Sequence, residues 1–385
     1  MSLPAAVELL PAAPWLLPFL TLPRLANRTP NLSDAPRASG AALLSVIIPA
    51  RNEADTIAIA IRSILGSSYE PLELLVVDDR STDGTASIVQ SFSADHRLRL
   101  IQGEDMPEGW YGKPWACLQG YRQAKGELLL FTDADTRHSP ELLERAVGAL
   151  ETQRADLVTV SPTQLCVTFW ERLIMPQIWF LLSLRYSPAS VNRAARARDV
   201  IANGQFILTS RAAYETAGTH ASVRHEGAED LALAQTYLHR GLKLHFAFAE
   251  RLMETRMYRG LRSLIEGWSK NIYLGGRRSF PDEPLARALV PLMLVIAMGY
   301  WLLPPLTLLL AAVLPGLAHL REPALLASFI SVVFWMLICW GMKIPAVYGL
   351  GYPLGALMAL YIAVRSTWRG ARRVEWRGRV YGTKA

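Results

Sequence analysis

The sequence predicts an α/β domain with a mostly parallel β-sheet, joined to a block of membrane-spanning helices. Between residues 43 and 278, apolar β-branched runs alternate with helical patterns, and several of these runs end in acidic residues. From Ala288 to Val364 the chain carries almost no charge. This segregation explains how a chain of 385 residues can be 51% hydrophobic and still contain 19% charged residues.

The strands of the α/β domain are predicted from runs that lack a helical period. LLSVIIPA (43–50) and LELLVVDD (72–79) are continuous apolar runs, typical of strands buried on both faces, and ELLLFTDAD (127–135) is a later run of the same type. Helical spacing of Ile57, Ile61 and Ile64 predicts a helix after the first strand, and STDGTASIVQSF (81–92) opens a second one. Alternation of this kind predicts a parallel sheet with right-handed crossovers.

Four acids follow these strands, and they predict a ligand site. Asp78, Asp79, Asp133 and Asp135 fall at carboxyl ends, where ligands bind in parallel sheets. A lone D-x-D pair also occurs as a helix cap or in a solvated loop, but several acids at one edge repel each other without a cation between them. Oxygen ligands favour Mg²⁺ or Mn²⁺ held together with substrate phosphates, so the expected substrate is a nucleotide diphosphate.

Several other classes of protein are excluded. The chain has neither a Walker A motif nor G-x-G-x-x-G, which argues against a P-loop ATPase and a dinucleotide dehydrogenase. Its net charge of +7 does not indicate a nucleic-acid partner, because no nucleic-acid-binding motif is present and six arginines gather between Arg365 and Arg379, after an apolar run. The three cysteines have no metal-ligand spacing and are expected to be structural.

The apolar block predicts several membrane passes. Residues 324–342 and 344–364 each have the length and composition of a span. Residues 288–318 would form a helix of roughly 45 Å, interrupted by Pro304 and Pro305, and correspond either to two short passes or to one long kinked pass. The charged domain and the arginine-rich tail are both expected in the cytoplasm, so the number of crossings between them must be even. This favours two passes within residues 288–318, which with the other two spans makes four in total.

The remaining segments complete a predicted organisation at the inner membrane, with the main domain in the cytoplasm. Residues 3–22 are apolar and are followed by Arg24 and Arg28, which favours an uncleaved anchor over a signal peptide, with an interfacial segment as the alternative. In residues 256–273 an apolar stripe interleaved with basic residues predicts an interfacial helix, or else a core-facing amphipathic one. Residues 165–184 predict a second interfacial helix.

The expected parts are an anchor (1–25), a linker (26–42), a cytoplasmic domain (43–255), an interfacial helix (256–284), transmembrane helices (285–364) and a basic tail (365–385).

Four motifs in order resemble the family 2, GT-A-type inverting glycosyltransferases. They are SVIIPARNE (45–53), VVDDRSTDGT (76–85), FTDAD (131–135) and GAEDLALA (227–234). Together with GKPWA (112–116), GWSKN (267–271) and the tail VEWRGRVY (374–381), the layout is similar to the membrane-bound glycosyltransferases associated with hopanoid biosynthesis, which are relatives of ceramide glucosyltransferase. The resemblance implies a GT-A fold, a nucleotide-sugar donor, with a UDP-sugar as the first candidate, and a lipid acceptor.

The resemblance also implies roles for individual residues. The expected nucleotide-binding residues are Pro49, Ala50, Arg51, Glu53, Asp78, Asp79, Lys113 and Asp133. Asp133 and Asp135 resemble the metal-binding pair, with Asp133 alternatively holding the ribose. Asp230 resembles the catalytic base and Glu229 its supporting acid, while Gln205, Trp268 and Lys270 are acceptor candidates. The loops at residues 203–205 and 220–225 are expected to shape specificity. Both histidines, His220 and His225, are expected to be solvated, with contact to the substrate as the alternative.

Several of these roles have a structural alternative. Asp78 serves equally as a helix-capping or sheet-end acid, Lys113 as a surface lysine and Asp230 as an N-cap or first-turn acid of the following helix. Trp268 either stacks on the acceptor or packs internally, since only the tryptophan of the Q-x-x-R-W motif is present, with Leu264 and Gly267 at the other two positions.

The predicted function is transfer of a sugar from a nucleotide diphosphate to a lipid hydroxyl. Inverting transfer needs a carboxylate to take the acceptor proton and a cation to stabilise the departing diphosphate. The alternative acceptors are a polyisoprenyl phosphate and a polysaccharide, and the departure from Q-x-x-R-W argues against a processive polymerase. Outside this class, a sugar-phosphate nucleotidylyltransferase and a non-catalytic membrane scaffold remain as rivals.

Overall fold

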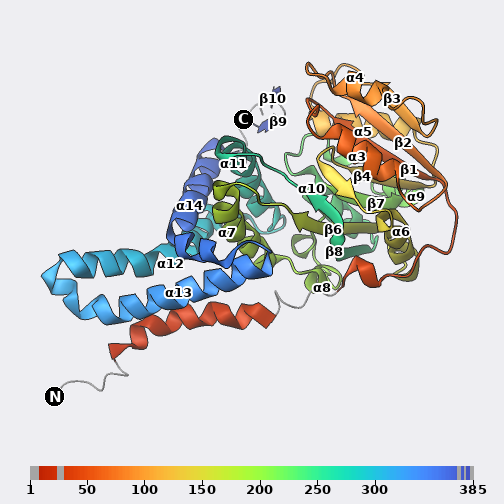
Figure 1. Ribbon diagram of the computed structural model, residues 1–385. Coiled ribbons are helices and arrows are strands. Elements are labelled where there is room, and N and C mark those ends of the chain that lie inside the picture. Colours follow the sequence, from red (N-terminus) through yellow and green to blue (C-terminus); the bar gives the residue numbers. More distant parts are fainter. Residues whose placement is uncertain (1–7, 24–29, 371–373, 377–378, 382–385) are drawn as a thin grey trace.

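The chain folds into a mixed α/β domain and a separate group of apolar helices (Figure 1). The structure is a computed structural model and describes residues 8–23, 30–370, 374–376 and 379–381. The domain is built on an eight-stranded sheet of order β3-β2-β1-β4-β7-β6-β8-β5. Its strands are β1 (Leu44–Ala50), β2 (Leu72–Asp78), β3 (Leu98–Gln102), β4 (Leu128–Thr132), β5 (Thr136–His138), β6 (Leu157–Gln164), β7 (Phe206–Ser210) and β8 (Leu244–Thr255).

The register of the sheet gathers the predicted site at one edge. Strands β1, β2, β3 and β4 are mutually parallel, so β1, β2 and β4 all end at the same edge. Strand β7 runs antiparallel to β4, and its first residue, Phe206, pairs with Thr132 at the end of β4. The loop just before β7 therefore lies beside the acids that follow β4.

Helices cover both faces of the sheet, which explains the continuous apolar strands. Along β1 the side chains of Val46 and Ile48 join one core cluster, whereas Ile47 joins the cluster on the opposite face. The first face is covered by α3 (Ile57–Leu65), α4 (Thr85–Gln90) and α6 (Leu142–Thr152). The second is covered by α5 (Gly112–Gln123), α9 (Arg211–Thr216) and α10 (Glu229–His239). Short connecting elements are η2 (Leu32–Asp34), α8 (Pro188–Val191), η3 (Ala197–Asp199) and η4 (His220–Val223).

Within the described residues, three C-terminal segments are long and apolar enough to cross a membrane: residues 284–313, 315–341 and 346–369. They contain α12 (Pro284–Val313), η5 (Pro315–Leu320), α13 (Arg321–Gly341), η6 (Ala346–Gly351) and α14 (Tyr352–Arg369). The prediction of two passes within residues 288–318 is wrong, because α12 is one continuous helix of 30 residues that includes Pro304 and Pro305. The prolines remove two backbone donors without ending the helix, and Pro304 is buried in it.

A short N-terminal helix packs on the hairpin that α12 and α13 form. This is η1 (Leu10–Thr21), a 3₁₀ helix of 12 residues within the apolar segment predicted at residues 3–22, of which residues 3–7 lie outside the described part of the chain. Trp15 stacks on Tyr300 of α12 with ring centroids 5.2 Å apart, and Phe19 meets Phe334 of α13 edge to face. Part of the expected linker also packs: Leu32 is 1% exposed and lies in the core of the domain.

Two further helices connect the domain to the apolar group. They are α7 (Phe169–Arg185) and α11 (Leu261–Arg278), which occupy the two segments expected to be interfacial helices. They share a buried cluster in which Ile174, Met175 and Ile178 of α7 meet Leu264 and Trp268 of α11. A two-stranded sheet of β9 (Val374–Trp376) and β10 (Arg379–Tyr381) follows α14.

Candidate active site

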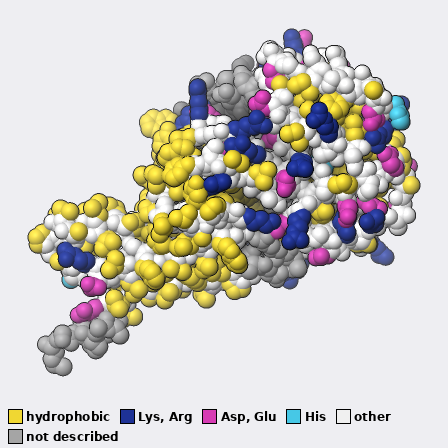
Figure 2. Space-filling model, in the orientation of Figure 1, with side chains coloured by type: hydrophobic (Ala, Val, Ile, Leu, Met, Phe, Trp, Pro, Cys, Tyr) yellow, Lys and Arg dark blue, Asp and Glu magenta, His cyan; other side chains and the backbone are white. Residues whose placement is uncertain are grey.

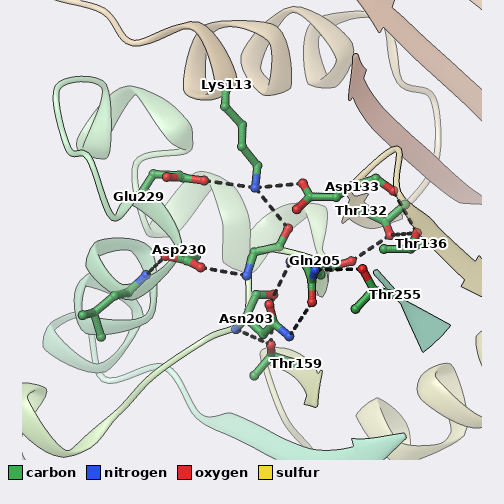
Figure 3. Close-up of polar contacts among 12 residues, drawn as sticks. Lys113, Thr132, Asp133, Thr136, Thr159, Asn203, Gln205, Glu229, Asp230 and Thr255 are labelled. Carbon is green, nitrogen blue, oxygen red and sulfur yellow. Dashed lines mark hydrogen bonds and ion pairs between the residues drawn. The ribbon is translucent and has the colours of Figure 1, made fainter. Parts of the chain in front are cut away.

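A largely buried lysine binds the acids of two separate motifs (Figure 3). Lys113, in the first turn of α5, has its Nζ 2.8 Å from Asp133 Oδ1 and 3.1 Å from Glu229 Oε1. It also donates a hydrogen bond to the Gly204 carbonyl at 3.4 Å. With 18% of its side chain exposed, Lys113 is not an ordinary surface lysine. The site thus joins the loop after β4, the loop before β7 and the start of α10.

The charges around Lys113 keep it protonated. Burial acts to lower the pKa of Lys113, but the carboxylates of Asp133, Glu229 and Asp230 outweigh it and raise the pKa well above its usual value. A protonated amine here offsets the repulsion between the acids that follow β4 and those that open α10.

Asp230 is held by two backbone amides. Its Oδ2 accepts a hydrogen bond from the Gly204 amide at 2.9 Å, and its Oδ1 accepts one from the Leu231 amide at 2.7 Å. Burial, assisted by the neighbouring Glu229 carboxylate, raises the pKa of Asp230 to about 6. Asp230 is therefore a first-turn acid of α10, as the structural alternative supposed, and at the same time a carboxylate whose basicity suits proton transfer near neutral pH.

Glu229 lies in the opposite electrostatic situation. Burial acts to raise its pKa, but Lys113 and Lys270 outweigh burial and lower it. Burial lowers the pKa of Lys270, which faces this group of charges from α11. Two adjacent carboxylates with pKa values pushed in opposite directions are a pattern found where one acts as acid or base and the other stays ionised.

Gly204 is a part of the site that the motifs did not single out. A Cβ added at Gly204 would lie 3.0 Å from Asp230 Oδ2 and 3.0 Å from Lys113 Nζ, tighter than most carbon contacts. The absence of a side chain lets the Gly204 amide approach the Asp230 carboxylate while its carbonyl contacts Lys113. Sequence reasoning placed this loop near the substrate but not between the two charged groups.

We expect Gly204→Ala to lower kcat by up to about tenfold, because a misplacement of reacting groups by about 1 Å costs on the order of 100-fold and the shift required here is smaller. The added methyl group would lie 3.0 Å from Asp230 Oδ2 and from Lys113 Nζ, so these side chains must shift slightly. Gly299→Ala in α12 is the matched control, since a Cβ there meets nothing within 4 Å. Steady-state kinetics of both variants, with thermal unfolding to verify folding, tests this; equal rates for the two variants would refute the role of Gly204.

The first two strands supply the expected nucleotide side of the site. Asp79 is fully buried after β2, and the Arg51 guanidinium donates to the Asp79 carbonyl at 2.5 Å, which ties the turn after β1 to the turn after β2. Glu53 is buried and its amide donates to Thr85 Oγ1 at 2.8 Å. Asp78 is the last residue of β2 and accepts from the Ser81 amide at 3.3 Å. This bond stabilises the turn after β2 and does not cap α4, which begins at Thr85. Pro49 and Ala50 end β1 at this edge.

Two of the acceptor candidates are buried in structural contacts. The Gln205 amide group donates to Thr255 Oγ1 at 3.1 Å, and its side chain is 4% exposed. Trp268 is 6% exposed, with its indole N–H 3.3 Å from the sulfur of Met175 and its ring edge-to-face with Trp179. The Trp268 contacts are internal packing between α7 and α11, whereas Gln205 binds the end of β8.

The expectation that both loop histidines are solvated is wrong for His220. His220 is 2% exposed, its ring lies 4.7 Å from that of Phe131, and its Nδ1 is 2.6 Å from the Tyr214 hydroxyl. Burial lowers the pKa of His220 to about 3, so the ring is neutral. His225 is exposed. Because η4 folds back beneath β4, a contact that local pattern does not encode, His220 lines the small pocket beside Lys113 and Asp230.

The donor set at the end of β4 fits a divalent ion that binds together with a diphosphate. Among the residues that the structure describes, no group of three His, Cys, Asp or Glu side chains converges into a complete metal site. Two carboxylates completed by substrate phosphates and water are, however, a usual arrangement for Mg²⁺. Asp133 already carries a positive neighbour, the Lys113 ammonium, and 27% of its side chain is exposed.

The mixed sheet, with acids at its carboxyl edge and helices on both faces, defines the GT-A fold, as predicted. Residues 45–214 match the family model described as glycosyl transferase family 2. The chain is similar to the 4,4'-diaponeurosporenoate glycosyltransferases of two Staphylococcus aureus strains, USA300 and NCTC 8325, with 30% identity over 246 residues, or 62% of this chain. The match spans 63% of those relatives, which is less than two thirds of their length.

A solved structure shares the overall architecture. It is the mannosyltransferase PcManGT from Pyrobaculum calidifontis in complex with GDP-Man and Mn²⁺, with a TM-score of 0.56 and 22% identity. The similarity covers 94% of this chain and 98% of the other. At this level of identity the similarity concerns the fold.

Proposed function

We propose that this chain is a membrane-anchored inverting glycosyltransferase that moves a sugar from a nucleotide-diphosphate donor to the hydroxyl group of a lipid. A UDP-sugar is the first candidate for the donor. The observation that carries the proposal is the arrangement of Lys113, which joins the D-x-D acid Asp133 to the Glu229–Asp230 pair within one small pocket. The match to glycosyl transferase family 2 and the similarity to 4,4'-diaponeurosporenoate glycosyltransferases support the reaction class, and three apolar helices in the described part of the chain support a membrane setting. A hopanoid-type lipid is the acceptor that the sequence resemblance favours.

In the proposed reaction Asp230 accepts the proton of the acceptor hydroxyl. The freed oxygen attacks C1 of the sugar from the face opposite the diphosphate, so the bond from C1 to the new oxygen forms as the bond from C1 to the phosphate oxygen breaks. Lys113 lies between the two reacting sides and stabilises negative charge on the leaving group. Asp133 and Asp135 would hold Mg²⁺ or Mn²⁺, which supplies further positive charge to the diphosphate. Asp79, Arg51 and Glu53 are proposed to shape the nucleotide pocket.

Glu229 and Lys270 are proposed to tune the base. Glu229 stays ionised beside Lys113, and its negative charge helps to raise the pKa of Asp230. Trp268 and Gln205 are proposed to position the residues that contact the acceptor and not to contact the acceptor themselves, because both side chains are buried in packing contacts.

The pH dependence follows from the raised pKa of Asp230. Only the ionised carboxylate accepts a proton, so we expect kcat/KM to rise about tenfold per pH unit below 6 and to level off above about 7, since this ratio reports the pKa values of the free enzyme. Initial rates between pH 4.5 and 8 measure this. A profile that is flat through pH 6 contradicts assignment of the base to Asp230.

The function is tested with purified full-length protein, Mn²⁺, a panel of radiolabelled nucleotide sugars and a total membrane-lipid extract. We expect label from one donor, with UDP-sugars tested first, to enter the organic phase, and mass spectrometry then identifies the lipid. Label in a polyisoprenyl phosphate or a polysaccharide instead would change the acceptor class. Formation of nucleotide sugar from a sugar phosphate and a nucleoside triphosphate would support a nucleotidylyltransferase, and no turnover with any donor would support a scaffold.

A further inference from the structure

One continuous apolar stripe runs along the outer face of η6 and α14. Seven side chains recur at alternating intervals of three and four residues, which places them on one side of a helix, and they are between 41% and 87% exposed. They are Val347, Leu350, Leu354, Leu357, Tyr361, Val364 and Trp368. A stripe of this length needs an apolar surrounding.

The opposite face of α14 lies across α7 and α11. Gly355 contacts α7 so closely that a Cβ there would lie 2.5 Å from the Leu173 carbonyl oxygen. At the other end, Arg369 lies 2.7 Å from Glu266 of α11, Arg365 pairs with the same carboxylate, and Ser366 Oγ accepts from the Tyr273 amide at 2.9 Å. Both halves of α14 are therefore fixed to helices that connect to the α/β domain.

Polar contacts tie both ends of α7 and the C-terminal end of α11 to the α/β domain, and a short connection holds the start of α11. At the start of α7, Glu171 pairs with Arg256, the residue that follows β8, at 2.9 Å, and at its end Arg185 pairs with Asp199 of η3 at 2.9 Å. The end of α11 is held by a pair between Arg278 and Glu226, while its start follows β8 after five residues. Both α7 and α11 therefore lie beside the α/β domain at both of their ends.

The hairpin of α12 and α13 behaves differently. Glu283, just before α12, pairs with Arg198 of η3, and Lys343, just after α13, lies 3.7 Å from Glu250 of β8. The start of α12 and the end of α13 thus both contact the α/β domain, whereas the turn between the two helices, at η5, lies far from the domain (Figure 1). Because Lys343 also precedes α14, both ends of α14 lie on the domain's side of the hairpin.

We propose that only the α12–α13 hairpin crosses the bilayer among the three candidate spans, and that α14 lies flat in the membrane interface with its apolar stripe on the lipid. In Figure 2 the hydrophobic surface beside α14 continues without a break into that of the hairpin, which identifies lipid as the occupant of both. Arg365 and Arg369 near the end of the stripe, and Trp368 within it, are residue types that favour an interface.

This arrangement changes the expectation that residues 344–364 form a span. Two crossings return the chain to the side of the α/β domain, and an interfacial α14 leaves the arginine-rich tail on that side. The tail and the domain therefore share a compartment without a fourth crossing, as the distribution of arginines requires. The inference does not depend on the reaction that the domain performs.

Cysteine labelling tests the topology in the full chain. Single cysteines at Ser87 on α4, Gly316 in η5 and Thr383 in the tail are treated with a membrane-impermeant maleimide in spheroplasts and in inverted vesicles, with the unsubstituted chain as background. We expect Ser87→Cys and Thr383→Cys to be labelled in the same preparation and Gly316→Cys in the other. Labelling of Thr383→Cys together with Gly316→Cys would show that α14 spans, and labelling of Gly316→Cys together with Ser87→Cys would show that the hairpin does not cross; either overturns the proposal.

The depth of α14 is a second, independent measurement. Tyr361 lies at the middle of α14, so a fluorophore on Tyr361→Cys reports a shallow position if the helix is interfacial and the bilayer centre if it spans. In liposomes with nitroxide-labelled lipids we expect stronger quenching by shallow than by deep nitroxides, with Ser87→Cys as the aqueous control. Stronger quenching by deep nitroxides contradicts the proposal. Weak quenching together with crosslinking between two Tyr361→Cys chains would mean that a second copy covers the stripe, and would also overturn it.

Discussion

Replacing Asp230 with asparagine is expected to lower kcat by about 10²- to 10⁴-fold, the usual contribution of a general base, with little change in KM for the donor. Asparagine has nearly the same shape but cannot take the acceptor proton. It also has one acceptor oxygen where Asp230 uses two, so one of the bonds from the Gly204 and Leu231 amides is lost. Single-turnover rates with saturating donor separate this chemical effect from donor binding.

A matched substitution elsewhere controls for loss of an aspartate. Asp156 lies just before β6, at the opposite edge of the sheet, and its Oδ2 accepts from the Lys243 amide at 2.8 Å. Because asparagine keeps that acceptor, Asp156→Asn is expected to retain full activity. Full activity in Asp230→Asn, with Asp156→Asn behaving as wild type, would remove Asp230 from the mechanism.

The double substitution Asp133→Ala with Asp135→Ala is expected to weaken Mn²⁺-dependent donor binding by at least about 10²-fold, since even outer partners of metal ligands contribute 10- to 100-fold. Calorimetry with UDP and with GDP, each with Mn²⁺ and with a chelator, measures this. Wild-type protein should bind one of the two nucleotides more tightly with Mn²⁺, whereas the double variant should show no difference between Mn²⁺ and chelator. A retained Mn²⁺ effect would contradict the metal site.

The single variants decide whether both aspartates bind the metal ion or only Asp135 does. Asp133 pairs with Lys113 at 2.8 Å, so Asp133→Ala removes a counter-ion of Lys113 as well as a candidate metal ligand. If Asp135 alone reaches the metal and Asp133 holds the ribose, Asp135→Ala abolishes the Mn²⁺ effect while Asp133→Ala only weakens nucleotide binding. If both bind the ion, the two single variants lose the Mn²⁺ effect to a similar degree.

The sequence predicted the parts of this fold that depend on local pattern. The strands at 43–50 and 72–79 are found as β1 and β2, because a continuous apolar run is sufficient to identify a strand buried on both faces. The meeting of acids at one edge followed from parallel pairing alone, which the register of β1, β2 and β4 confirms.

The contacts inside the site depended on tertiary structure. Nothing within residues 112–116 shows that the Lys113 ammonium reaches Asp133 and Glu229, or that Gly204 fits between Lys113 and Asp230. The prediction that His220 is solvated was wrong for the same reason, because His220 is buried by contacts with Tyr214 and with Phe131 of β4.

The membrane part shows where composition is insufficient. Pro304 and Pro305 suggested a break that packing overrides, and the hydropathy of residues 344–364 matches a span as well as an interfacial helix. What distinguishes the two is the pairing of Arg369 with Glu266 and the close contact of Gly355 with α7, neither of which is visible in hydropathy.

The central claim is a single displacement with one carboxylate as base, and the anomeric configuration of the product tests it most directly. With an α-configured nucleotide sugar, the proton–proton coupling at C1 of the purified glycolipid, measured by nuclear magnetic resonance, reports the configuration of the new bond. A single attack from the face opposite the diphosphate predicts a β-linked product. An α-linked product would contradict the account, because retention requires a second displacement or attack from the same face, for which Asp230 alone is insufficient.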